Sequence, residues 1–192
     1  MPPKNKFTRE LVIQTALELV RREGMDALTA RGLAQELGCS VKPIFGLFQG
    51  MEEVQREVIA AAYGLYSRAI AEAMAAGEFP PYKASGMAYI DFARREKQLF
   101  RLLFMRDRRR ETEPGPDDTG PLLDLIQRSS GMSRENAALF HMEMWIYVHG
   151  VAAMLATDFL DWDRALVSAS MTDIYRGLLA RYQEKEAADE SH

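Results

Sequence analysis

Apolar residues in this chain recur mainly at intervals of three and four positions, the period of a helix that packs on one face. The first such stretch places its apolar side chains at Val12, Ala16, Leu19 and Val20. Thr8 precedes the stretch and is a good N-cap residue, whereas Gly24 follows it and is typical of the end of a helix. The pattern therefore predicts a first helix between Thr8 and Gly24.

A second, short helix is predicted after Thr29, another suitable N-cap residue, and Gly38 ends it. Its inner face comprises Leu33, Ala34 and Leu37. A three-residue turn that contains glycine follows, and a third helix begins after Ser40, its expected N-cap. Two short helices joined in this way form the helix-turn-helix pattern.

The third helix has two faces of different composition. Its expected inner face comprises Val41, Ile44, Phe45 and Phe48. Its expected outer face comprises Lys42, Pro43 and Gly46. Neither proline nor glycine has a side chain that donates a hydrogen bond. Any base contact by Pro43 and Gly46 is therefore predicted to depend on thymine methyl groups and on close approach of the backbone.

The remainder of the chain is also predicted to be helical. A long helix is expected at 51–75, and further helices are expected at 82–95, 97–106, 119–129, 133–159 and 163–185. The stretch 108–118 is expected to be a polar loop. The predicted fold is therefore all-α, with about nine helices in two domains. A three-helix helix-turn-helix domain is expected at residues 1–50 and a helical domain at residues 51–192.

The composition favours a cytoplasmic, globular protein. Apolar residues make up 47% of the chain and charged residues 27%, which is enough apolar material for a core. The longest apolar run, at 145–160, is interrupted by His149 and Asp158, and it falls short of the ~18 residues that suggest a membrane span. The beginning of the chain has no apolar core of a signal peptide. The single cysteine, Cys39, excludes an internal disulfide and a cysteine-based zinc site.

Charge is distributed unevenly along the chain. The net charge is −4, but residues 1–50 carry a net charge of +2 and residues 51–192 carry −6. A basic first part permits contact with nucleic acid, whereas the acidic remainder is kept away from phosphate.

Residues 29–40 have the spacing T-x-x-x-L-A-x-x-L-G-C-S, residues 44–48 follow as I-F-x-x-F, and residues 52–54 are Glu-Glu-Val. These segments and their spacing are similar to segments of one family of regulators. Residues 8–54 therefore resemble the TetR family of transcriptional regulators. A weaker resemblance lies at residues 145–150, where W-x-x-x-H-G is similar to a helix in one class of the family's C-terminal domains.

The resemblance implies a homodimer that binds a palindromic operator in double-stranded DNA. In the family the last two long helices form the dimer, the third helix enters the major groove, and a small molecule in the C-terminal domain changes the spacing of the two DNA-binding domains. Repression is the family's usual mode. The implied DNA-binding positions are Thr29, Arg31, Ser40, Val41, Lys42, Pro43, Phe45 and Gly46.

Three positions depart from the family pattern. The family often has tyrosine at position 45 and histidine at 47, and it nearly always has lysine at 51, where this chain has Phe45, Leu47 and Met51. Each lost phosphate contact would remove roughly one released counterion from the salt dependence of binding. One hypothesis is that Lys4, Lys6 and Arg9 compensate as an N-terminal arm. The alternative is a tail that only increases solubility.

The C-terminal part has the residues of an effector site and of a dimer interface. Adaptable apolar and aromatic side chains suit a pocket for a small apolar or amphipathic effector. Candidate effector contacts are Tyr89, Phe100, Phe104, His141, Met142, Trp145 and His149. For each of them, ordinary core packing is the alternative. The helices at 133–159 and 163–185 carry small and apolar residues at helical spacing and are the expected dimer helices.

No catalytic or cofactor motif occurs in the sequence. It contains no nucleophile elbow, P-loop, dinucleotide fingerprint or zinc-protease motif, so neither an enzyme nor a cofactor or metal site is expected. Two other interpretations stay open. One is a helical enzyme or small-molecule carrier with an incidental helix-turn-helix. The other is a member of the family that has lost DNA binding and acts through protein contacts.

Overall fold

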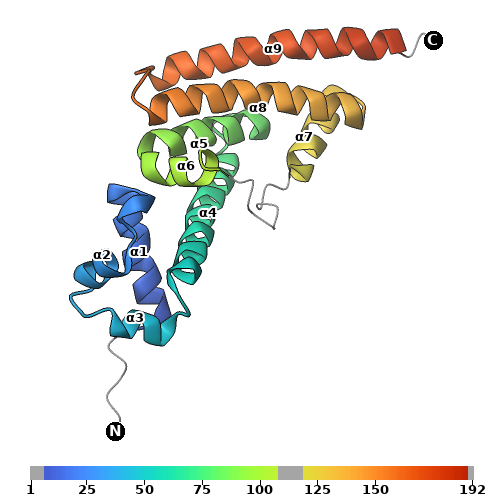
Figure 1. Ribbon diagram of the computed structural model, residues 1–192. Helices are drawn as coiled ribbons and strands as arrows, with labels where there is room; N and C mark the ends of the chain where they lie inside the picture. The colour runs from blue at the N-terminus through green and yellow to red at the C-terminus, as the bar shows by residue number, and fades with distance from the viewer. Residues whose placement is uncertain (1–6, 108–118, 190–192) are drawn as a thin grey trace. The chain divides into compact units, whose positions relative to one another are not determined.

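The computed structural model describes residues 7–107 and 119–189, which form nine α-helices, one 3-10 turn and no strand (Figure 1). The elements are α1 (Arg9–Glu23), η1 (Met25–Ala27), α2 (Ala30–Glu36), α3 (Lys42–Leu47), α4 (Met51–Ala76), α5 (Pro81–Arg95), α6 (Lys97–Phe104), α7 (Gly120–Ser130), α8 (Arg134–Ala156) and α9 (Arg164–Asp189). The predicted all-α class with about nine helices is confirmed. The predicted loop at 108–118 lies outside the described residues.

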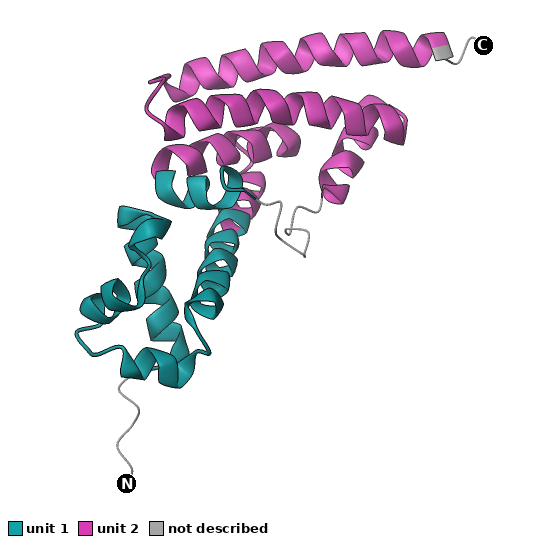
Figure 2. Ribbon diagram, in the orientation of Figure 1, with its two compact units in different colours: residues 1–67, 96–108 teal, residues 68–95, 109–192 magenta. Residues whose placement is uncertain are grey.

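The chain folds into two compact units, one of residues 1–67 and 96–108 and the other of residues 68–95 and 109–192 (Figure 2). Helix α4 contributes to both units, and α6 belongs to the first unit although α5 belongs to the second. This structural division falls at different residues from the expected functional boundary after residue 50, which stays a prediction.

In the first unit, α1 packs against α2 and α6. The fully buried side chains of this unit include Val12, Ala16, Val20, Leu33, Ile44, Val54, Val58, Leu99, Phe100 and Leu103. An ion pair also joins α1 to the start of α6, because Arg21 Nε donates a hydrogen bond to Glu96 Oε2 at 2.6 Å. The apolar face predicted for the first helix is therefore the face that forms this core.

In the second unit, α5, α7 and α9 pack against α8, and α8 and α9 lie side by side along their lengths (Figure 1). Helix α8 ends at Ala156, before the predicted residue 159, because Asp158 adopts a left-handed backbone with φ 58°. Helix α9 extends beyond the predicted residue 185. Its Glu186 accepts hydrogen bonds from Asn136 Nδ2 and the Ser133 hydroxyl, both at 2.7 Å, which anchors this end to the start of α8.

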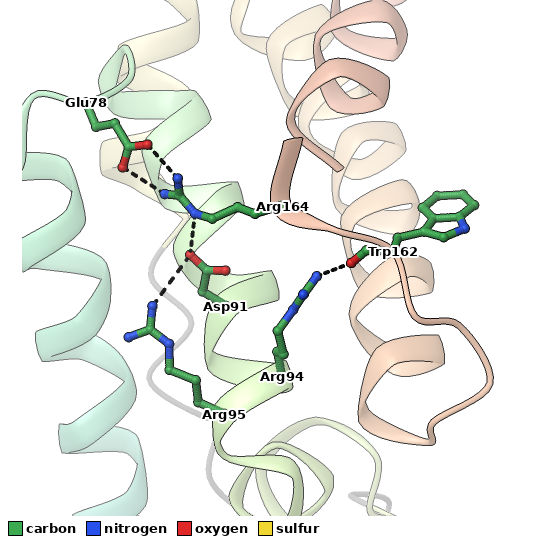
Figure 3. Close-up of polar contacts among 6 residues, drawn as sticks. All are labelled: Glu78, Asp91, Arg94, Arg95, Trp162 and Arg164. Atoms are coloured by element: carbon green, nitrogen blue, oxygen red, sulfur yellow. Dashed lines mark hydrogen bonds and ion pairs between the residues drawn. The ribbon is translucent and has the colours of Figure 1, made fainter. Parts of the chain in front are cut away.

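The other end of α9 is anchored by arginine side chains (Figure 3). Arg164 donates to both carboxylate oxygens of Glu78, at 2.5 and 2.8 Å, and its Nε lies 3.2 Å from Asp91 Oδ2. Arg94 donates a hydrogen bond to the carbonyl oxygen of Trp162. The Arg164 guanidinium lowers the pKa of Glu78 below its ordinary value, so that carboxylate is charged at neutral pH. These contacts hold the connection between α8 and α9 against α5.

Candidate nucleic-acid interface

Helices α2 and α3 form the expected helix-turn-helix geometry, with three residues, 38–40, between their cap residues. Thr29 is the N-cap of α2 as predicted, since its Oγ1 accepts a hydrogen bond from the Gly32 amide at 3.0 Å. Gly38 has φ 61°, a left-handed conformation that favours glycine. Gly32 is needed for a different reason, because a Cβ there would lie 2.8 Å from the Ala27 carbonyl oxygen.

The prediction that Ser40 caps the third helix is wrong. The N-cap of α3 is Val41, and no side chain makes a capping hydrogen bond there. An N-cap side chain accepts from the amide two or three positions later, and the amide three positions after Ser40 would belong to Pro43, which has no N–H. The Val41 backbone is already helical, and its carbonyl oxygen accepts from the amides of Ile44 and Phe45.

The inner face of α3 is narrower than the sequence suggested. Ile44 and Phe48 are buried as predicted, with exposed fractions of 0% and 3%. Val41 and Phe45 were predicted to be inner residues as well, and this is wrong, because they are 36% and 49% exposed. Val41 and Phe45 therefore join Lys42 and Gly46 on the surface.

All of the residues proposed to contact DNA are accessible. The exposed ones are Thr29, Arg31, Ser40, Val41, Lys42, Phe45 and Gly46, and Pro43 is half-buried. Leu47 and Met51, where the family has polar residues, are also half-buried. DNA contact by these residues stays a prediction, but none of their side chains is buried in the core.

Arg9 is bound within the first unit, which argues against its role in an N-terminal arm. Its guanidinium lies over the Phe48 ring and donates to the Leu47 carbonyl oxygen at 2.6 Å and to Glu53 at 2.7 Å. It also pairs with Glu57. A hydrogen bond from the Gln49 amide, followed by the contact with Arg9, lowers the pKa of Glu53. Lys4 and Lys6, the other two proposed arm residues, lie outside the described residues.

Basic side chains of the first unit fall into two groups. Arg9, Arg21 and Arg22 all pair with glutamates of the same unit. Arg31 and Lys42, in contrast, are exposed and make no ion pair with any residue in the described ranges. Two cations without an ion pair in the described ranges therefore lie at the helix-turn-helix, where they are available to an external anion, and a third, Arg56, is exposed on α4.

Three of the candidate effector contacts meet in the second unit. The hydroxyl of Tyr89 lies 2.8 Å from His149 Nδ1, and the His149 ring stacks on Trp145 with 4.9 Å between ring centroids. Burial lowers the pKa of His149, so the ring is neutral at pH 7 and its Nδ1 can accept a hydrogen bond from the phenol. Trp145 is about half exposed, and Met142 on the same helix is also exposed.

A second tyrosine–histidine pair lies on the same two helices. His141 Nδ1 lies 3.0 Å from the hydroxyl of Tyr82, whose ring also contacts Phe140 and Tyr175. Burial lowers the pKa of His141 and raises that of Tyr82. Tyr82 was not among the residues predicted from the sequence. Its position seven residues before Tyr89, with His141 eight residues before His149, is a periodic signal that could have indicated both pairs.

The remaining candidates, Phe100 and Phe104, belong to the first unit. Phe104 makes edge contacts with Tyr63 and Tyr66, at centroid distances of 6.2 and 5.0 Å, and it also contacts Phe100. The buried Tyr63 hydroxyl has no hydrogen-bond partner within the described parts of the chain. The seven candidate effector residues therefore divide between the two units, with Phe100 and Phe104 in the first and the other five in the second.

Residues 82–178, just over half of the chain, match the family model of the tetracycline-repressor-like C-terminal domain. The chain belongs to the TetR family. The matched region begins in α5 and ends in α9, so it includes the W-x-x-x-H-G segment of α8. No curated relative matches the chain.

Among the described residues of this TetR-family chain, no group of three His, Cys, Asp or Glu side chains is placed so that it could hold a metal ion. One helix there, α8, is long and apolar enough to cross a membrane by length and composition alone. That is weak support for a membrane span, because a core helix of a soluble protein passes the same test.

Proposed function

We propose that this TetR-family protein is a homodimeric, ligand-responsive transcriptional regulator of the cytoplasm that binds DNA sequence-specifically. In this proposal it is a repressor, released from a palindromic operator when a small apolar or amphipathic molecule binds the C-terminal domain. It works without catalysis, metal or cofactor. The observation that carries DNA binding is the surface of the helix-turn-helix, where Arg31 and Lys42 are exposed cations without a carboxylate partner among the described residues.

In this proposal, α2 and α3 contact different parts of the DNA. Thr29, Arg31 and Ser40, which are exposed, contact the phosphate backbone, and the exposed face of α3 contacts base edges in the major groove. The absent tyrosine, histidine and lysine at positions 45, 47 and 51 leave fewer phosphate contacts than is usual in the family. The proposal therefore includes a shallower salt dependence than that of a typical relative.

Dimerisation through α8 and α9 is supported by apolar side chains that the subunit itself leaves exposed. They are Met142, Trp145 and Ile146 on α8, and Leu166 and Ile174 on α9. The three on α8 recur at i, i+3 and i+4, so they lie on one face. A Cβ built on Gly150 or Gly177 meets no other atom within 4 Å, so nothing inside the subunit fills the space beside either glycine. A second copy of the same helices would bury this surface across a two-fold axis.

The first test is a selection of genomic fragments by the purified, full-length protein, with affinity followed against salt concentration. A palindromic site whose half-sites are about one helical turn or a multiple of it apart is the expected result. Lys42→Ala should weaken binding to that site, whereas Arg22→Ala should not, because Arg22 pairs with Glu36 in the free protein. Weak binding with no sequence preference would contradict the proposal and favour a member that acts through protein contacts.

The effector proposal is tested with a panel of apolar and amphipathic compounds, scored by release of the operator and by a rise in Tm. Tyr89→Phe removes the hydroxyl that contacts His149, and Tyr63→Phe removes the unpartnered hydroxyl of the other aromatic group. A compound whose release of DNA is weakened by only one of these variants identifies the group that binds it. Turnover of a compound without DNA affinity would instead support the enzyme or carrier interpretation.

A further inference from the structure

The outer face of α3 has a composition that suits one feature of the DNA major groove. At helical spacing, Val41 and Phe45 form one row and Lys42 and Gly46 form the next. Phe45 is 49% exposed and Val41 is 36% exposed, although both are large apolar side chains. Lys42 is the one side chain of these four that can donate a hydrogen bond to a base. Contacts from the row of Val41 and Phe45 must therefore be made by apolar atoms.

Gly46 has no reason within the protein to be glycine. It lies inside a helix, where glycine is a weak helix former, and its φ is not positive. A Cβ at this position would meet no atom within 4 Å. Gly32 in the neighbouring helix differs, because a Cβ there would lie 2.8 Å from a backbone oxygen. An external molecule that approaches the α3 backbone closely accounts for glycine at position 46.

The charges of the helix-turn-helix favour a polyanion as the external molecule. Lys42 lies in the row next to Val41 and Phe45, Arg31 is exposed on the neighbouring α2, and neither pairs with a carboxylate within residues 7–107 or 119–189. A protein that docked here through Val41 and Phe45 alone would leave both cations without compensation. Duplex DNA presents phosphates to the cations and, in its major groove, one apolar group: the C5-methyl of thymine.

We infer that Phe45 and Val41 recognise thymine C5-methyl groups, and that Gly46 is present because the base edges approach the helix backbone at that point. This inference rests on the proposed function and specifies the chemistry of the same surface. Thymine is the base whose major-groove edge carries a methyl group, so an apolar side chain there distinguishes it from the other bases. Phe45, which lacks the family's phosphate-binding hydroxyl, thus acts as a specificity residue.

The test replaces thymine by deoxyuridine, which removes the methyl and leaves the hydrogen-bonding groups unchanged. Each thymine of the selected operator is replaced in turn, at equivalent positions of both half-sites, and binding of the full-length dimer is measured at constant salt. Burial of one methyl corresponds to about a fourfold change in affinity, so about 16-fold is expected for two half-sites. In Phe45→Ala or Val41→Ala, the same replacement should change affinity less than about twofold, because the partner of the methyl is gone.

Two further variants keep the result interpretable. Phe45→Leu retains an apolar side chain and should retain sensitivity to the thymine methyl. Gly46→Ala should fold normally and bind the operator about tenfold more weakly, because the added methyl blocks the approach. Sequence-specific binding that is equal for thymine and deoxyuridine at every position would overturn the inference and leave the proposed function intact. Absence of sequence-specific binding to any DNA would overturn both.

Discussion

The outer face of α3 and the outer faces of α8 and α9 both expose large apolar side chains, but the charges around them differ. Beside α3, Arg31 and Lys42 make no ion pair within the described ranges. On α8 and α9, Glu143 is paired with Arg181 at 2.8 Å, and the exposed Asp173 and Arg176 on α9 have opposite signs. An apolar surface bordered by unpaired cations suits a nucleic acid, whereas one bordered by charges of both signs suits another protein surface. Apolar exposure alone does not identify the partner.

The largest effect is expected on the α8 surface. In a variant with Trp145→Asp and Ile146→Asp, two carboxylates would be buried against the second copy, so the protein should become monomeric. Operator affinity should then fall at least about 100-fold, because the two DNA-binding domains no longer act together. Sedimentation equilibrium and fluorescence anisotropy measure the two effects. Leu11→Asp is a matched control, because Leu11 is similarly exposed but lies on α1. A double variant that remains dimeric would contradict the proposal that the exposed apolar face of α8 forms the dimer.

The next effect concerns the two helical glycines of the helix-turn-helix. Gly32→Ala should lower the free energy of unfolding by about 1–3 kcal/mol, since the new Cβ would lie 2.8 Å from a backbone oxygen. Gly46→Ala should raise it by about 0.5–1 kcal/mol, because alanine is the better helix former and meets no other atom. Denaturant titration of both variants measures the difference. If Gly46→Ala lowered the free energy of unfolding more than Gly32→Ala does, α3 would need glycine for its own folding. The explanation by an external molecule would then be contradicted.

A smaller effect distinguishes free from paired cations. Lys42→Ala should reduce the slope of log affinity against log salt by about one for each DNA-binding domain in contact, because one phosphate neutralisation is lost. Arg22→Ala should leave the slope unchanged, since Arg22 is paired with Glu36 and Glu23 before DNA binds. Equal slopes for the two variants would contradict the division of the basic residues into two groups.

The smallest effect is expected for a paired cation of the second unit. Arg164→Met should lower Tm slightly and leave operator affinity unchanged, because Arg164 pairs with Glu78 and Asp91 within that unit (Figure 3). The folded-state pKa of Glu78 is lowered, so its contribution to stability is present above its ordinary pKa of 4.5 and is lost as the pH falls below that value.

The difference in Tm between wild type and Arg164→Met should therefore be constant near neutral pH and should shrink in acid. Thermal unfolding followed by circular dichroism from pH 7 to pH 3 measures it. Arg95→Met is the control, because Arg95 lies 3.9 Å from Asp91 and is more exposed. A difference that grows in acid would mean that the ion pair is not the source of the effect.

The helices were predictable from local patterns, because capping and apolar periodicity act over a few residues. Thr8 and Thr29 accept the hydrogen bonds expected of N-caps, and α1 buries the predicted face. The N-cap prediction for Ser40 was wrong, since one of the two amides that it could cap would belong to Pro43, which has no N–H. The observed C-terminal ends of α8 and α9 also differ from the predicted ones. The left-handed Asp158 and the contacts of Glu186 with α8 set these ends, and both depend on tertiary structure.

The candidate DNA-binding residues were more predictable from the sequence than the candidate effector residues. The positions of the helix-turn-helix follow from the sequence, and all of them are at the surface or half-buried. The side on which Val41 and Phe45 lie was not predictable, because helical spacing allows either side of a short helix. For the effector residues, only a group of aromatic, histidine and methionine side chains was predictable. Their division into two units and the pairs Tyr82–His141 and Tyr89–His149 required the packing of α5 on α8.

The sequence by itself determined the helical class, the helix-turn-helix spacing and the resemblance to the TetR family. These depend on interactions between residues a few positions apart, which are similar in any compact fold. Tertiary structure alone decided which arginines are paired, which glycines are needed for packing and which apolar residues remain exposed. Arg9 is the clearest example. Its partners Glu53 and Glu57 are more than 40 positions away in the sequence, and only the packing of α1 against the start of α4 brings the three side chains together.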